Sequence, residues 1–201
     1  MRIRPALVLP FAALAAFAGD QAMVGSLEWR PTSTLAESIG ALNLLPLEGA
    51  RIWVEPFTDN RADKDLLGEN QERPETLVVK TRDDVAAFLC GHTAQLFKDA
   101  GLPMAAKADV ATTVVTAEVM RYKVIEKDTY KGELNLMLQV RVGGKLLWKG
   151  VAMGEATRWG RSFKMENYQE VLSDCLIDAV GKVLKSPAFL HALAGKAEAN
   201  H

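Results

Sequence analysis

Residues 133–142 show the clearest alternation of apolar and polar side chains in the sequence. Leucine or valine occupies every second position from Leu134 to Val142, and polar residues or Met fill the positions between. A period of two with one apolar face is typical of a half-buried antiparallel strand. Gly143–Gly144 then predicts a tight hairpin turn, after which residues 145–157 return as a second strand.

Three further segments favour strands. Residues 111–125 are rich in Val and Thr, and they complete a three-stranded meander with the two strands above. Residues 51–57 contain good strand formers, and their proline predicts an edge position or the end of pairing. Residues 76–80 predict a short additional strand. The intervening residues 58–74 are polar and charged and predict a long loop.

Two segments show the 3.6-residue period of a helix. Residues 83–100 place apolar side chains on one face, begin with two aspartates and end at Gly101. Residues 165–185 carry a continuous apolar stripe from Tyr168 to Val183. Pro187 follows and predicts a stop or the start of a short final helix.

The order strand, helix, three strands, helix predicts an α+β fold, built as a two-layer sandwich. We expect a mainly antiparallel sheet of about four or five strands with two helices packed on one face. This single domain spans residues 50–193, and a mobile tail covers residues 194–201. Small side chains along residues 150–156 would let a helix approach the sheet closely.

The N-terminus predicts export. Residues 1–18 combine two arginines, an apolar run too short to span a bilayer, and an Ala-Phe-Ala cleavage site. Residues 19–49 are interrupted by prolines, and we expect them to form an extension along the domain surface. Nothing in the mature chain predicts a transmembrane segment. The protein should therefore be periplasmic or secreted.

Composition narrows the function further. The chain of 201 residues has 24 Lys and Arg against 25 Asp and Glu, a formal net charge of -1. This balance argues against a nucleic-acid partner. Nucleophile-elbow, phosphate-loop and metal-ligand motifs are absent from the sequence, so we predict no enzyme activity, no metal and no cofactor.

Export would place Cys90 and Cys175 in an oxidising compartment, where two cysteines often pair. Each lies on a predicted helix, and the two helices are expected to be neighbours. A disulfide and two separate buried thiols both remain open at this point, because sequence does not show whether the sulfur atoms are close.

Two clusters have the composition of contact surfaces. One contains Arg158, Trp159, Arg161 and Phe163, between the last strand and the last long helix. Aromatic and arginine side chains dominate binding hot spots, although ordinary packing of the two rings would also explain them. The other cluster is the pair Asn60–Arg61. These residues could form a contact loop or a simple turn stabilised by Asx hydrogen bonds.

Three stretches carry a resemblance to a known family: RIWVEPFTDNR, YKVIEKDTYKGELNLMLQVRV and NYQEVLSDCLIDAVGKVLKSPAFLHAL. Residues 50–193 resemble the YajG-type family of periplasmic lipoproteins and, more distantly, the auxiliary lipoproteins of ABC-type envelope transport systems. The resemblance implies a periplasmic setting and a two-helix sandwich without known enzyme activity. Asp20 stands where that family has its lipid-bearing Cys. Asp20 therefore argues against a lipid anchor. We expect outer-membrane association only if such an anchor exists.

We therefore expect a non-enzymatic exported protein that serves as a binding or accessory component of a cell-envelope transport or assembly system. Its partners would be envelope proteins, and homo-oligomer formation remains open. One alternative is a carrier or sensor of a small apolar or lipid-like ligand, held between helices and sheet. Another is a hydrolase whose site forms only in three dimensions.

Overall fold

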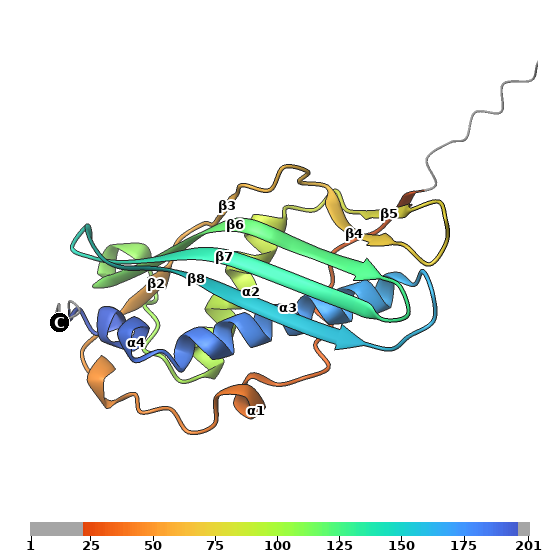
Figure 1. Cartoon of the computed structure of the whole chain (residues 1–201). Helices are drawn as coiled ribbons and strands as arrows, with labels where there is room; N and C mark the ends of the chain where they lie inside the picture. The colour runs from red at the N-terminus through yellow and green to blue at the C-terminus, as the bar shows by residue number, and fades with distance from the viewer. Residues whose placement is uncertain (1–21, 197–201) are drawn as a thin grey trace, which may run out of the picture.

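A computed structural model describes residues 22–196, which form one twisted sheet with helices along one face (Figure 1). The predicted signal peptide, residues 1–18, and Asp20 lie outside the described residues, as does most of the predicted tail.

The three-stranded meander is present as predicted. Its long antiparallel strands are β6 (Thr113–Glu126), β7 (Tyr130–Val142) and β8 (Lys145–Arg158). One face of the meander is buried against helices, which matches the alternation in the sequence. The opposite face is open to solvent, and Met120, Val151 and Met153 are about half exposed there.

The sheet is larger and more mixed than we expected. Within residues 22–196 it has eight strands rather than four or five. The short strands are β1 (Ala22–Val24), β2 (Ile52–Val54), β3 (Thr58–Asp59), β4 (Leu66–Asn70) and β5 (Leu77–Lys80). Of these, β2 and β5 lie within the strands predicted at residues 51–57 and 76–80, whereas β1, β3 and β4 are additional.

These strands also correct the predicted loop at residues 58–74, which contains both β3 and β4. The long strand β6 pairs in parallel with β2, β3 and β4, one after another along its length. Because each of these partners has only two to five residues, none shows a local period. The sheet is therefore mixed: the long antiparallel pairings of the meander are as predicted, and short parallel pairings join β2, β3 and β4 to β6.

Both long helices were predicted correctly. They are α2 (Val85–Asp99) and α3 (Met165–Leu184). Two short α-helices, α1 (Leu35–Ile39) and α4 (Pro187–Leu193), bring the total within the described residues to four rather than two. Single 3₁₀ turns lie at Leu45–Leu47 and Ala108–Val110.

Helix α3 packs directly beneath β8. A Cβ atom on Gly154 would lie 1.9 Å from the carbonyl oxygen of Cys175, so only glycine permits this approach. At the outer edge of β8, the amide of Glu155 donates to the Asp178 carboxylate of α3, at 2.9 Å. Gly154 thus accommodates the helix itself, whereas the Trp148 ring lies over Gly150. These contacts fill the space that the carrier hypothesis required at this point.

The segment before the domain wraps across the helices. The Asp174 carboxylate of α3 accepts hydrogen bonds from the backbone amides and hydroxyls of Thr32 and Ser33. The Trp29 ring stacks on His92 of α2, with ring centres 4.3 Å apart. The N-terminal extension is thereby fixed to both long helices.

Candidate functional site

The connection between β8 and α3 presents an aromatic side chain to solvent. We call residues 158–164 the Trp159 loop. Trp159 is 75% exposed, and Arg161 is also exposed. Phe163 instead packs against the hydrophobic core. The loop therefore separates its two aromatic rings, one of which anchors the segment while the other faces water.

A buried carboxylate fixes the base of the loop. Glu126, at the end of β6, is only 1% exposed. Its carboxylate accepts the backbone amide of Phe163 at 2.8 Å and the hydroxyl of Tyr168 at 2.6 Å. Burial and the neighbouring Glu126 carboxylate raise the pKa of the Tyr168 hydroxyl far above its usual value, so this hydroxyl stays protonated and donates.

A second set of contacts fixes the middle of the loop. The backbone carbonyl of Arg161 accepts hydrogen bonds from the Tyr130 hydroxyl and, at 2.9 Å, from the Asn167 side chain. The Ser162 hydroxyl accepts the Asn70 amide at 3.2 Å and donates to the Glu72 carboxylate. Strands β4 and β7 and helix α3 thus all hold this segment in place.

Phe163 has a strained backbone conformation. Its φ of 53° is the one positive value at a non-glycine residue among residues 22–196. Such a conformation persists only where surrounding contacts enforce it, and it occurs often at functional sites. Here the Glu126 hydrogen bond to the Phe163 amide and the packing of the ring supply that constraint.

The charges of the loop are unevenly paired. Arg158 forms an ion pair with Glu170 of α3, and its Nε donates to the Trp159 carbonyl. The exposed side chains of Arg161 and Lys164 make no ion pair or hydrogen bond within the described part of the chain. Two cations of the loop are therefore available to an external partner.

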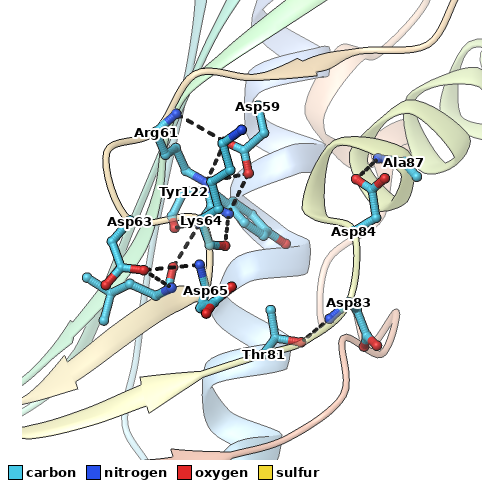
Figure 2. Close-up of polar contacts among 11 residues, drawn as sticks. Asp59, Arg61, Asp63, Lys64, Asp65, Thr81, Asp83, Asp84, Ala87 and Tyr122 are labelled. Atoms are coloured by element: carbon cyan, nitrogen blue, oxygen red, sulfur yellow. Dashed lines mark hydrogen bonds and ion pairs between the residues drawn. The ribbon is translucent and has the colours of Figure 1, made fainter.

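The second predicted contact, Asn60–Arg61, has a different role (Figure 2). Arg61 is only 8% exposed. Its guanidinium pairs with Asp59 at 2.8 Å and donates to the backbone carbonyls of Lys64 and Leu66, the latter at 2.8 Å. A longer contact of 3.4 Å reaches the Tyr122 carbonyl of β6. Arg61 therefore stabilises the turn from inside and is not a surface contact.

The pKa of the Asp59 carboxylate reflects its contacts with Arg61. Burial acts to raise its pKa, but hydrogen bonds and the positive charge from Arg61 outweigh that effect and hold the pKa below its usual value. Asn60 faces outward and donates to the Glu118 carboxylate at 2.8 Å. Of this pair, only Asn60 is positioned near the surface.

A polar cleft of about 390 Å³ lies between this turn and the start of α2. Asp84 lines the cleft and caps the helix by accepting the Ala87 amide at 2.9 Å, as Figure 2 shows. Asp83, also in the lining, accepts the Leu27 amide at 2.6 Å. These carboxylates have structural partners, and residues 22–196 contain no group of three side chains suited to hold a metal.

The two predicted contact regions do not meet. The Asn60 amide donates to the Val119 carbonyl in the middle of β6, whereas the Trp159 loop is fastened to Glu126 at the end of that strand. Local composition did not mark Glu126, or the hydroxyls of Tyr130 and Tyr168, as parts of a site. Period-two counting from Tyr122 and Val124 places Glu126 on the buried face, and this was the available signal.

The cysteine pair is not bonded in the structure. Cys90 and Cys175 are both free thiols. The half-buried Cys90 thiol donates to the Glu55 carbonyl at 3.3 Å, whereas Cys175 is buried beneath β7 and β8. Burial raises the pKa of Cys175 to about 12, so this thiol is unreactive at neutral pH.

Comparison with known proteins identifies the fold. No family model and no curated protein matches the sequence. Among solved structures, protein XCC0632 from Xanthomonas campestris, of the DUF330 family model, has a TM-score of 0.56 at 11% identity, covering 81% of this chain and 92% of that one. This likeness establishes the overall fold.

Two other solved structures are less similar. The PelC dodecamer from Paraburkholderia phytofirmans has a TM-score of 0.40 at 13% identity, covering 69% of this chain and 92% of that one. Lipoprotein GNA1162 from Neisseria meningitidis has a TM-score of 0.27 at 16% identity, covering 54% of this chain and 83% of that one.

Among residues 22–196, no helix has both the length and the apolar character needed to cross a membrane.

Proposed function

We propose that the protein is a non-enzymatic accessory component of the bacterial cell envelope that acts by binding through the Trp159 loop. The observation that carries this proposal is a tryptophan held 75% exposed by a loop whose base is hydrogen-bonded to the buried Glu126 carboxylate. Export predicted from the N-terminus and the resemblance to periplasmic lipoproteins support the envelope setting. The shared fold with a DUF330 protein is compatible with it.

The loop is suited to binding because it is already ordered. A flexible segment loses backbone freedom when it binds, at about 1–2 kcal/mol for each residue that becomes ordered. The hydrogen bonds from Tyr130 and Asn167 fix the backbone at Arg161 before any partner arrives. Tryptophan and arginine are also the residues that most often dominate binding energy.

Site-specific photo-crosslinking in the native host tests the proposal. A photoreactive amino acid at position 159 should form specific adducts, whereas the same group at Leu45 should not. Leu45 is a matched control because it is 78% exposed and lies far from the loop, near α4. Adducts of twice the chain mass would identify a second copy as the partner. Equal labelling from both positions would count against the Trp159 loop as the contact.

A further inference from the structure

We infer that the outer edge of β8 pairs with the same edge of a second copy of this chain, antiparallel and about a two-fold axis at Ala152. The two sheets would then join into one continuous sheet, with residues 149–155 of each subunit in the contact. This inference goes beyond the proposed function. It concerns a different surface from the Trp159 loop and does not depend on what that loop binds.

The outer edge of β8 carries backbone groups that point away from the sheet. β8 is the last strand of the sheet, and β7 is its one strand partner within the described part of the chain (Figure 1). The amides of an antiparallel strand point alternately toward its partner and away from it. The Glu155 amide points away from β7 and donates to Asp178. The register is regular from there to position 149, so the amides of Lys149, Val151 and Met153 also point outward. Such a row is a template for another strand.

Apolar side chains lie beside this edge on the open face of the sheet. Val151 is 49% exposed and Met153 is 52% exposed. Ala152, between them, is buried on the opposite face, toward the helices. A second copy paired along this edge would cover the two exposed side chains, and removing apolar surface from water favours association.

The sequence of the edge is complementary to itself. Residues 149–155 read Lys-Gly-Val-Ala-Met-Gly-Glu. With the axis at Ala152, Lys149 would lie opposite Glu155 of the partner subunit, and Val151 opposite Met153 of the partner subunit. Opposite charges and apolar pairs at such positions stabilise antiparallel strands, and the symmetry forms each pair twice. An axis at Val151 or Met153 would instead place Glu155 opposite an apolar side chain, so Ala152 is the favoured centre.

The two charged ends of the segment have no ion-pair partner in the described structure. Neither Lys149 nor Glu155 forms an ion pair there. Glu133 of β7 lies opposite Glu155 and is already paired with Arg121. Lys131, two residues earlier on β7, forms no ion pair with either acid among the described residues. Lys149 of the partner subunit would therefore supply the countercharge that Glu155 lacks.

Helix α3 leaves most of this edge open. It lies beneath β8, where Gly154 meets the Cys175 carbonyl. Its Asp178 side chain, which is also paired with Lys182, occupies the Glu155 amide. The partner strand would therefore accept its hydrogen bonds from the amides between positions 149 and 153. A two-fold axis perpendicular to the sheet would keep both copies of α3 on the same face of the joined sheet.

Sedimentation velocity of the purified full chain tests the inference. We expect a monomer–dimer equilibrium that shifts toward dimer with rising concentration. Lys149→Glu should place like charges opposite each other at both ends and weaken the dimer by at least about tenfold. Glu155→Lys should do the same, whereas Lys149→Glu combined with Glu155→Lys should restore the dimer. Lys107→Glu is the matched control, because it makes the same charge change at an exposed position near β2.

Disulfide formation between copies tests the register directly. Opposite residues of a hydrogen-bonded antiparallel pair have Cα atoms about 5.5 Å apart, which suits a disulfide. In chains carrying Cys90→Ser, we expect a mixture of Val151→Cys and Met153→Cys chains to form disulfide dimers faster than either variant alone. In each variant alone, the two cysteines would be diagonal neighbours, about 7–8 Å apart.

Several results would overturn the inference. A chain that stays monomeric up to about 1 mM would do so. A dimer that survives both single charge reversals, or that the double reversal does not restore, would mean that the second copy docks elsewhere. A photoreactive residue at position 153 that captures only a different protein in the host would assign the edge to a foreign strand. Unfolding curves of the charge variants should match the parent chain, because both positions are exposed. None of these results changes the crosslinking test at position 159, so the two proposals fail separately.

Discussion

The Trp159 loop and the turn at residues 58–66 look alike in sequence but differ in structure. Each places an arginine in a short polar segment beside the sheet. Arg161 lies in water, whereas Arg61 is 8% exposed and bound by several backbone carbonyls. The arginine that satisfies the carbonyls of its own turn is therefore buried. The arginine whose loop is hydrogen-bonded by other elements remains exposed.

The two segments achieve order in opposite ways. In the turn, the Arg61 side chain donates hydrogen bonds to the backbone carbonyls of Lys64 and Leu66. In the Trp159 loop, the Tyr130 hydroxyl and the Asn167 amide satisfy the carbonyl of Arg161. Because β7 and α3 supply those donors, the order of the loop does not depend on hydrogen bonds from the Arg161 guanidinium.

The largest expected difference is therefore between the two arginines. Arg61→Ala leaves the partly buried Asp59 carboxylate and two carbonyls without their donor, so we expect a loss of about 3–5 kcal/mol in the free energy of unfolding. Arg161→Ala should change it by less than about 0.5 kcal/mol. Urea unfolding monitored by circular dichroism measures both. Similar losses in the two variants would contradict the assigned roles.

The buried base of the Trp159 loop gives the next largest effect. Glu126→Gln replaces an acceptor of two hydrogen bonds with a group that must also donate, so we expect a loss of about 1–3 kcal/mol in unfolding free energy. Amide exchange of residues 159–164 should become faster. The control is Glu133→Gln, because the Glu133 side chain is 52% exposed and forms only a surface pair with Arg121. Unchanged exchange in Glu126→Gln would show that the carboxylate does not hold the loop.

This contrast also explains what the sequence could and could not predict. Strands β6–β8 and helices α2 and α3 are long enough to show a period, and they were placed correctly. Strands β3 and β4 were missed because their order comes from parallel pairing with β6, a partner distant in sequence. The exposure of Trp159 and the burial of Arg61 depend on side chains from other elements, and local composition does not report them.

Acid unfolding tests the ion pair between Asp59 and Arg61 inside the turn. The folded-state pKa of Asp59 is lowered, so its stabilising contribution is present above the unfolded value, near 4, and is lost as the pH falls through the folded pKa. We expect Asp59→Asn to be less stable than the parent chain at neutral pH. That stability difference should shrink as the pH falls below about 4. A difference that stays constant across this range would mean that the pair with Arg61 does not hold the charged carboxylate.

The smallest expected effect on stability belongs to Trp159, and it is the most informative about function. Trp159→Ala removes a side chain that water already surrounds, so unfolding free energy should change by less than about 0.5 kcal/mol. The matched comparison is Trp148→Ala, on the strand β8 that precedes the loop. Trp148 is half-buried and packs edge-on against Phe189, with ring centres 5.0 Å apart, so we expect its removal to cost about 1–3 kcal/mol. If Trp159→Ala instead destabilised the fold as strongly, its indole would be a packing residue, and the reason to assign binding to this loop would disappear.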